Sequence, residues 1–410
     1  MMPLKTELLD VLTAPGYVSI IEGDPGSGKT TLALKACARH GNATYISYAD
    51  PEVSITRKLK LVDPQFSGSF NVVSMLSGKP DRAFSLIEEA IGRGELVVVD
   101  SLDAMFYGMK EEVRAFLQMI YGSVKAKSGS LIMISEGLND VARQVRFVFD
   151  VIVEVKLVDV LGKGVRAIRL LKDRDHEIEH ALHYMTFSDM SILEPFPLLE
   201  QPALNRFSSI QRPKESETIL ETGPNILEEF DLDVSDIRAK LVREFMAAEY
   251  VMKGYSVNYT VGPNEDISDA LIDFKSLVGN YIDRLNIINI DARATGYKAI
   301  EFFNKSVSLY RPNSVNIINL LAEEEFAVNA PEEYEAFINL TMKENQGRIT
   351  LHFGHSNLNS TRIEMKYVNA ARKLTVTDGF LFWRSIKPQG PVYFVKMEPE
   401  KGSMEFVRMT

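Results

Sequence analysis

A glycine-rich octapeptide near the amino terminus constrains this chain more than any other feature of its sequence. The octapeptide reads Gly23-Asp24-Pro25-Gly26-Ser27-Gly28-Lys29-Thr30. Two glycines, a lysine and a hydroxyl at this spacing form a loop that cradles phosphate groups. An apolar run, Tyr17 to Ile21, precedes the loop and a helix-forming sequence follows it, so we predict a strand, a phosphate-binding turn and a helix. The alternative is a glycine turn with a surface lysine.

The loop also predicts which atoms would contact a nucleoside polyphosphate. Backbone N–H groups of the loop and the positive amino end of the following helix would hold the phosphates. Lys29 would reach the β and γ phosphates, Thr30 would hold Mg²⁺, and Thr31 would touch the α-phosphate. ATP and Mg²⁺ are therefore the expected cofactors.

A second part of such a site is an acid at the end of a buried strand. The run Leu96-Val97-Val98-Val99-Asp100 has four apolar residues in succession, which suits a central parallel strand covered on both faces. Asp100 would emerge at the carboxyl edge of the sheet, where ligands of open α/β sheets bind. We predict that Asp100 orders the water shell of Mg²⁺, the alternative being an aspartate that simply ends a strand.

The length, net charge and cysteine count of the chain limit the classes of protein to which it can belong. A chain of 410 residues is longer than one hydrophobic core supports, so two domains are expected. The net charge of -10 disfavours a protein that mainly neutralises nucleic-acid phosphates. The single cysteine, Cys37, rules out an internal disulfide and favours a reducing compartment. No apolar run is long enough to span a bilayer and no signal peptide is recognisable, so we expect a cytoplasmic protein with no membrane partner.

The first half of the chain predicts a parallel sheet flanked by helices. Short apolar β-rich runs alternate with amphipathic stretches, the pattern of an α/β fold. Two later β-type runs around a glycine turn predict a hairpin on the edge of the sheet. The expected strands are 17–22, 43–48, 96–100 and 131–135, the helices 30–39, 80–91 and 111–126, and the hairpin strands 151–158 and 165–171.

A proline-containing segment precedes a second α/β pattern. Prolines and scattered acids without sustained periodicity predict a linker over 191–235 between domains 1–190 and 236–410. The strands expected in the second domain are 255–261, 285–290, 315–321 and 348–353, with a β-rich tail over 374–383 and 392–397.

The two halves resemble one another in the order of their elements, and in their endings the likeness extends to individual residues. Phe149-Asp150-Val151-Ile152-Val153 pairs with Thr377-Asp378-Gly379-Phe380-Leu381 in this alignment. We interpret this as an internal duplication. The alternative is that all α/β domains look alike.

These parts together resemble the RecA superfamily, and within it the KaiC, RadA and GvpD-like proteins of archaea and bacteria. The resemblance covers about residues 1–190 and rests on the phosphate loop, the strand ending in Asp100, and the closing run Arg169-Leu170-Leu171-Lys172-Asp173-Arg174. In that family a Lys-x-Arg element reaches the nucleotide of a neighbouring subunit. The resemblance therefore implies a RecA-like fold, a homo-oligomer, and contacts from Lys172 and Arg174 to the γ-phosphate in trans. The alternative is two solvated charges at the end of a strand.

The sequence departs from the family where the chemistry is most sensitive. Family members carry one or two glutamates after the second strand to orient the attacking water, and only Asp50 stands there in this chain. Asp50 is either a shorter base or a turn residue before Pro51, so slow hydrolysis or nucleotide sensing becomes credible.

The second half has lost the phosphate-binding residues. The segment after its first expected strand, 261–268, lacks the lysine and the second glycine, and Lys396-Met397-Glu398 replaces the arginine of the tail by an acid. The resemblance is to the two-domain architecture of GvpD-type regulators, with a degenerate RecA-like domain that docks a protein partner.

Two further signals favour structural readings. His176-Glu177-Ile178-Glu179-His180 has the spacing of a zinc protease but follows a strand rather than lying on a helix. The basic pair Arg143 and Arg146 lies where recombinases bind single-stranded DNA, but acids flank it and no aromatic platform is interleaved.

The sequence thus predicts an ATP-binding regulatory protein with slow hydrolysis coupled to assembly or to control of a partner. A RecA-like or RadA-like accessory ATPase in DNA recombination or repair is the alternative, and a scaffold with a vestigial nucleotide site is a third possibility.

Overall fold

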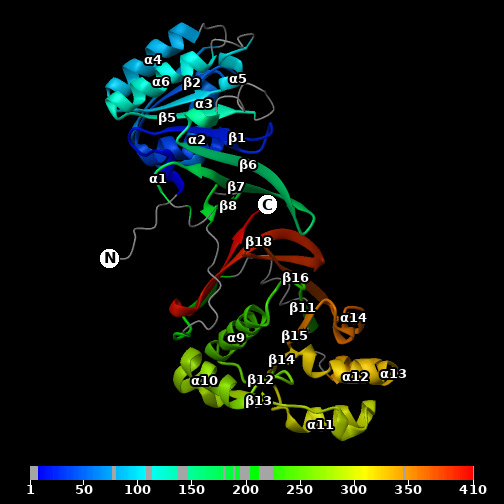
Figure 1. The fold of residues 1–410 in the computed structure, drawn as a ribbon. Helices are drawn as coiled ribbons and strands as arrows, with labels where there is room; N and C mark the ends of the chain where they lie inside the picture. The colour runs from blue at the N-terminus through cyan, green and yellow to red at the C-terminus, as the bar shows by residue number, and fades with distance from the viewer. Residues whose placement is uncertain are drawn as a thin grey trace. The chain divides into compact units, whose positions relative to one another are not determined.

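The computed structural model describes residues 8–75, 80–107, 113–136, 146–176, 178, 181–187, 190–193, 204–211, 225–344 and 348–409. The chain divides into two compact units, which we call unit 1 (1–159 and 164–194) and unit 2 (160–163 and 195–410). Each unit contains one mixed β-sheet with helices packed against it, so the predicted α/β class is confirmed for both (Figure 1).

The sheet of unit 1 has the strand order β3-β2-β4-β5-β1-β6-β7-β8-β9. The strands from β3 to β6 in this order run parallel, whereas β7, β8 and β9 are joined by antiparallel pairs. Their bounds are β1 Val18–Glu22, β2 Asn42–Ser47, β3 Ser69–Ser74, β4 Leu96–Asp100, β5 Ser130–Ser135, β6 Val151–Val160, β7 Lys163–Asp173, β8 Leu182–Met185 and β9 Ile192–Leu193.

Helices cover both faces of this sheet. The helices are α1 Leu8–Leu12, α2 Lys29–His40, α3 Glu52–Val62, α4 Pro80–Gly92, α5 Leu102–Met105, α6 Val113–Lys127 and the short η1 Arg146–Val148. On β4, Val98 packs with the residues of α1, α2 and α3, while Val97 and Val99 pack with those of α4, α5 and α6. Burial on both faces explains the uninterrupted apolar run that precedes Asp100.

Two expectations for unit 1 need correction. The sequence prediction omitted β3, because Ser69 and Asn71 are exposed, Phe70 is only partly buried, and the strand gives no apolar run. The hairpin of β6 and β7 is not at the edge of the sheet, since β8 and β9 add two more strands beyond it.

The sheet of unit 2 has the order β10-β19-β18-β17-β16-β11-β15-β14-β12-β13. The bounds are β10 Ser209–Gln211, β11 Asn225–Phe230, β12 Val257–Thr260, β13 Leu285–Ile288, β14 Val315–Asn319, β15 Thr350–His355, β16 Ala370–Thr377, β17 Phe380–Lys387, β18 Gln389–Glu398 and β19 Ser403–Arg408. The helices are α9 Asp236–Met252, α10 Ile267–Val278, α11 Ala299–Leu309, α12 Glu324–Asn329, α13 Pro331–Glu344 and α14 Asn359–Glu364, with short turns η2 Gly279–Arg284, η3 Arg293–Thr295, η4 Leu320–Ala322 and η5 Pro399–Lys401.

Nine strands follow the same order in the two units. Replacing β1 to β9 by β11, β12, β13, β14, β15, β16, β17, β18 and β19 converts one order into the other. A hydrogen bond supports the match: the Asp150 carboxylate accepts the Val18 N–H at 3.0 Å, and the Asn369 amide oxygen accepts the Asn225 N–H at 3.3 Å. Both side chains stand just before the strand that pairs with the central one.

This correspondence corrects the alignment made from sequence. The central strand of unit 2 is β11, which lies inside the range 191–235 that was predicted to be a linker. The counterpart of the phosphate loop is therefore 230–235 and not 261–268, which follows β12. The residue Asp150 corresponds to Asn369 rather than to Asp378, and the run Lys396 to Glu398 lies on β18, the counterpart of β8.

No helix in the described parts of the chain is both long and apolar enough to cross a membrane.

Candidate functional site

The phosphate-loop sequence lies between the central strand β1 and the helix α2. Parallel strands β5 and β6 flank β1, and the loop leaves its carboxyl end at Gly23. A Cβ on Gly23 would lie 2.0 Å from the carbonyl oxygen of Val155, so only glycine fits this close approach. Gly28 has φ of 111°, a left-handed conformation, and forms the residue before α2. Steric restrictions therefore explain why glycine stands at both positions.

The amino end of α2 has no side-chain cap. No side chain bonds to the first N–H groups of this 12-residue helix, so its positive end is presented toward the loop. Lys29 is the first residue of α2, and its ammonium group donates to the carbonyl oxygens of Gly23 at 2.7 Å and Asp24 at 2.8 Å. Lys29 is only 8% exposed, and burial lowers its pKa despite the opposing carboxylate of Glu136.

Thr30 and Asp100 are in direct contact. The Thr30 hydroxyl donates to Asp100 Oδ2 at 3.0 Å, and the Tyr45 hydroxyl donates to the same oxygen at 2.6 Å. Burial and the Asp100 carboxylate raise the pKa of Tyr45 well above its usual value, so its proton stays on the hydroxyl. The two residues expected to hold Mg²⁺ thus meet where α2 begins and β4 ends.

Asp50 lies at the same edge of the sheet but is already paired. Its carboxylate forms an ion pair with Lys58 at 2.6 Å. The Ser47 hydroxyl accepts the Asp50 N–H at 2.9 Å and donates to the Asp50 carbonyl at 2.7 Å. These contacts agree with the alternative that Asp50 is a turn residue before Pro51.

Lys172 and Arg174 lie at the other end of β1, away from the phosphate loop. Lys172 donates to the carbonyl oxygen of Phe149 at 2.5 Å, and burial lowers its pKa. Arg174 forms an ion pair at 3.0 Å with Asp150, which also accepts the Val18 N–H at the start of β1. Within one chain, neither cation is brought to the phosphate-loop sequence.

Three residues near the loop were not singled out from the sequence. Tyr45 contacts Asp100, Glu136 follows β5 and acts electrostatically on Lys29, and Arg166 of β7 packs beside Gly28. A Cβ on Gly28 would lie 3.0 Å from Arg166 Nε, which has no hydrogen-bond partner, and the guanidinium stacks on Phe187 at 4.0 Å. Each contact joins residues far apart in the sequence, so no local motif marks them.

In each unit, we call the region where the central strand of the sheet ends and the following helix begins the corner of that unit. The corner of unit 2, between β11 and α9, is a pocket lined by charged residues. Arg243 of α9 pairs with Glu265 and donates to the Tyr259 hydroxyl at 2.8 Å. Asn319 stands at the end of β14 as Asp100 does at the end of β4, and its amide lies 3.4 Å from Glu265 Oε2. Arg243 is paired with Glu265, and Lys240, which also lines the pocket, is paired with Asp273 and Glu244. Among the described residues, both the lysine and the arginine of this pocket are therefore already bound to protein carboxylates.

The zinc-protease spacing and the basic pair, which the sequence analysis interpreted as structural, contain two described residues, His176 and Arg146, and both have partners within the protein. His176 contacts Asp173 and the Tyr17 hydroxyl, and it lies between β7 and β8 rather than on a helix. His180 and Arg143 lie outside the described residues. Arg146 pairs with Glu22 at 2.6 Å. Among the described residues no cluster of three or more His, Cys, Asp or Glu side chains is arranged to hold a metal ion.

No protein-family model matches this sequence, and no curated protein is significantly similar to it.

Proposed function

We propose that unit 1 binds ATP with Mg²⁺ and that the chain is a RecA-superfamily regulatory protein of the KaiC or GvpD-like kind. The observation that carries the proposal is the uncapped amino end of α2, with the Lys29 ammonium beside it at the carboxyl end of β1. Helix N–H groups and a buried cation together attract a polyphosphate. Thr30 and Asp100, at 3.0 Å, supply the oxygen ligands or water contacts that Mg²⁺ prefers.

Binding requires a local exchange of partners. Lys29 would leave the carbonyls of Gly23 and Asp24 for the β and γ phosphates, and Thr30 would turn its hydroxyl oxygen from Asp100 to the metal. Asp50 would orient an attacking water only after releasing Lys58, which favours slow hydrolysis or sensing. Arg174 would reach a neighbouring subunit's γ-phosphate only after releasing Asp150.

The test is calorimetric titration of the full chain with ATP and Mg²⁺. We expect wild type to bind with micromolar or tighter affinity, Lys29→Ala to lose at least a hundredfold, and the exposed control Lys60→Ala to match wild type. Equal affinity of Lys29→Ala and Lys60→Ala would sink the assignment. Sizing the protein with and without the nucleotide, while phosphate release is followed, tests the coupling to assembly.

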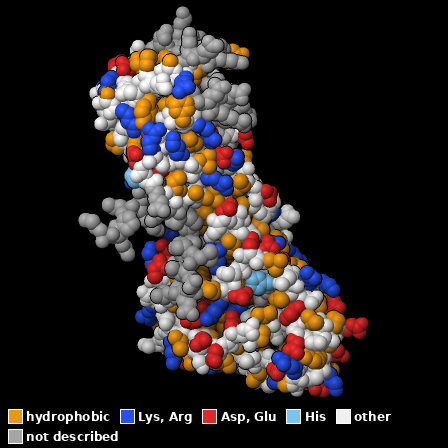
Figure 2. All heavy atoms as spheres, in the orientation of Figure 1, with side chains coloured by type: hydrophobic (Ala, Val, Ile, Leu, Met, Phe, Trp, Pro, Cys, Tyr) orange, Lys and Arg blue, Asp and Glu red, His pale blue; other side chains and the backbone are white. Residues whose placement is uncertain are grey.

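Adding single-stranded DNA to the ATPase assay distinguishes the regulatory function from a function in DNA recombination or repair. Figure 2 shows Lys and Arg side chains interspersed with acids on the visible face, the pattern of a solvated surface. We therefore expect the ATPase rate to be unchanged by single-stranded DNA. A salt-dependent stimulation would instead assign the protein to DNA recombination or repair.

A further inference from the structure

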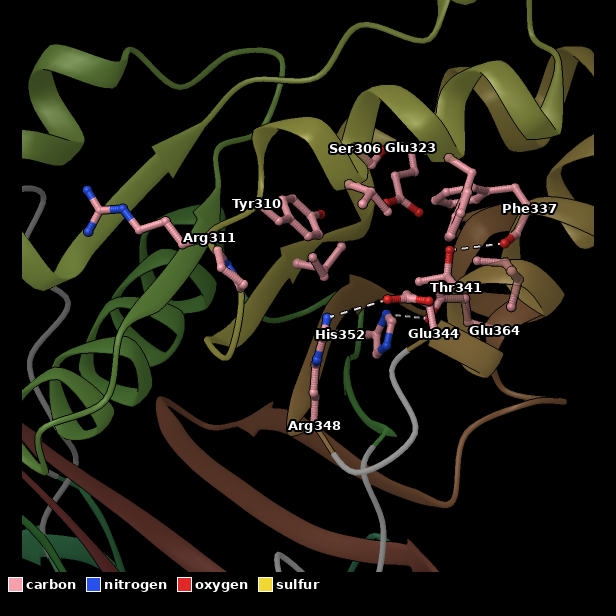
Figure 3. Close-up of a pocket in the computed structure, with 15 residues that line it drawn as sticks. Ser306, Tyr310, Arg311, Glu323, Phe337, Thr341, Glu344, Arg348, His352 and Glu364 are labelled. Atoms are coloured by element: carbon pink, nitrogen blue, oxygen red, sulfur yellow. Dashed lines mark hydrogen bonds and ion pairs between the residues drawn. The ribbon is translucent and has the colours of Figure 1, made fainter.

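Unit 2 contains a second pocket, of about 230 Å³, beside α11 and α13 (Figure 3). It is bounded by these two helices and by the strands β14 and β15, and it shares no lining residue with the corner that corresponds to the phosphate loop. Most of its wall is apolar, and the apolar side chains are Phe303, Val307, Pro312, Ile318, Phe337 and Ile338. Such a wall suits the apolar body of a small ligand.

Three ionisable side chains line the pocket although they are almost fully buried. His352 is 1% exposed, Glu323 4% and Glu364 0%. His352 Nδ1 lies 2.6 Å from Glu364 Oε2, so these two form an ion pair. The Tyr334 hydroxyl lies 2.8 Å from Glu323 Oε2 and 3.3 Å from Glu364 Oε1, and it joins the two acids. Within the described parts of the chain, His352 Nε2 has no hydrogen-bond partner.

The buried charges do not balance. Two carboxyl groups face one imidazole, and the cations at the rim are engaged elsewhere: Arg348 lies 3.8 Å from Glu344, and Arg311 donates to the Asp283 carbonyl. Figure 3 shows Arg311 extending away from the other labelled side chains. Among the described residues that line the pocket, Glu323 thus has no ion pair of its own, and only the more distant charge of His352, which is paired with Glu364, favours its ionised form.

The protonation states follow from this imbalance. Burial disfavours a charged imidazole, but the Glu364 carboxylate outweighs it and raises the pKa of His352. Burial and the Glu364 carboxylate together raise the pKa of Glu323 to about 8, so Glu323 holds a proton at neutral pH. The proton occupies the place that a ligand's positive charge could take.

We propose that this pocket binds a small primary amine, whose ammonium group pairs with Glu323 while its apolar body lies against Phe337 and Val307. The amine supplies the missing positive charge, and Glu323 then ionises and releases its proton to the solvent. The free Nε2 of His352 offers a hydrogen-bond donor to any oxygen that the ligand carries. The inference does not depend on nucleotide binding by unit 1.

The probe is 2-phenylethylamine, with 2-phenylethanol as its neutral match and 3-phenylpropanoate as its anionic match. We expect calorimetry at pH 7 to show the amine binding at least tenfold more tightly than the alcohol, with no binding of the carboxylate. Titrations in two buffers that differ in ionisation enthalpy should show nearly one proton released per amine bound. Affinity for the amine should rise from pH 6 to 9, because Glu323 progressively loses the proton that competes with the ammonium.

Two variants and one control complete the test. Glu323→Gln should abolish the preference for the amine over the alcohol and the proton release. Val307→Trp, at a position 43% exposed, should block both ligands without disturbing the core. Glu301→Gln, at an exposed position of α11 that does not line the pocket, should bind as wild type does. The proposal is wrong if wild type binds the amine no better than the alcohol, or binds neither at millimolar concentration, since the ionisable residues would then be a structural network only.

Discussion

The two units present opposite chemistry at the same corner of the same strand arrangement. In unit 1, the segment 23–28 joins β1 to α2, and in unit 2 the segment 231–235 joins β11 to α9, because β11 extends one residue further, to Phe230. Val18 and Asn225, whose N–H groups bond to Asp150 and Asn369, set the match, so that Glu22 corresponds to Glu229 and Gly23 to Phe230. Glu22 and Glu229 each pair with both neighbouring strands, and the pairing in β11 continues for one more residue, to Phe230. Both units have this corner because their strand order is the same, and the side chains there determine whether an anion can bind.

The difference is one of space and charge. Unit 1 has Gly23 against a backbone carbonyl and Lys29 at the start of its helix, whereas unit 2 has Phe230 and Asp236 at these two positions. Phe230 is buried and lies 6.1 Å from Phe353 between ring centroids. An aromatic ring and an aspartate have replaced the parts that would admit and hold phosphate, so the second corner contributes to stability instead.

The strongest test of this contrast is Phe230→Ala. Removing a fully buried aromatic side chain should lower the free energy of unfolding of unit 2 by about 3–5 kcal/mol. Leu232→Ala, in the same segment but 70% exposed, is the matched control and should change it by no more than about 0.5 kcal/mol. Urea denaturation measures both, and similar losses for the two variants would contradict the view that Phe230 fills the corner.

The ion pair in the second corner gives the next largest effect. Arg243→Met leaves the partly buried Glu265 without its cation and should destabilise unit 2 by about 3 kcal/mol. Adding Glu265→Gln should recover much of the loss, because no uncompensated charge then remains. If the double variant is no more stable than Arg243→Met, the pair does not act as a closed structural unit.

The sequence located the first corner but not the second, for a physical reason. The phosphate loop and the Val97 to Asp100 strand are local patterns, so spacing and an apolar run suffice to predict them. Strand β11 contains Glu228 and follows a proline-containing stretch, so it lacks the expected apolar pattern. Glu228 is fully buried because Arg372 and Trp383 bind its carboxylate. Those partners lie on β16 and β17, and no local rule predicts such contacts.

The same limit applies to the candidate site. The contact between Thr30 and Asp100 could be expected, since both were placed at the carboxyl edge of one sheet. The pairing of Arg174 with Asp150 and of Asp50 with Lys58 could not be expected, because it depends on side-chain directions in the folded protein.

Exchanging the strand-end residues sharpens the comparison further. Asp100→Asn should remove the increase in nucleotide affinity that Mg²⁺ provides, a loss of about 10- to 100-fold or 1.4–2.7 kcal/mol. Asn319→Asp, at the matching position of β14, should create no Mg²⁺-dependent nucleotide binding in unit 2, because Arg243 and Glu265 still occupy that corner. Calorimetry with and without Mg²⁺ measures both, and Mg²⁺-dependent binding that survives in Asp100→Asn contradicts the metal role.

The smallest predicted effect concerns α9, the helix that follows the corner of unit 2. Helix α9 buries the Glu244 carboxyl group, and burial raises its pKa from 4.5 to about 8 although Lys240 lies 3.6 Å away. The folded protein therefore holds a proton that the unfolded chain loses above its ordinary pKa. The stability from this group is complete below pH 4.5 and is lost as the pH rises through 8.

The wild-type free energy of unfolding should accordingly fall by about 1 kcal/mol per pH unit near neutrality through Glu244. Glu244→Gln cannot titrate and should reduce the slope by this amount, leaving the contribution of Glu323, whose pKa is also raised to about 8, while Glu332→Gln, an exposed position on α13, should keep the wild-type slope. Urea denaturation at several pH values between 5 and 8.5 decides the matter. Parallel pH profiles for wild type and Glu244→Gln would mean that the Glu244 carboxyl is ionised in the fold, with Lys240 holding its charge more strongly than burial opposes it.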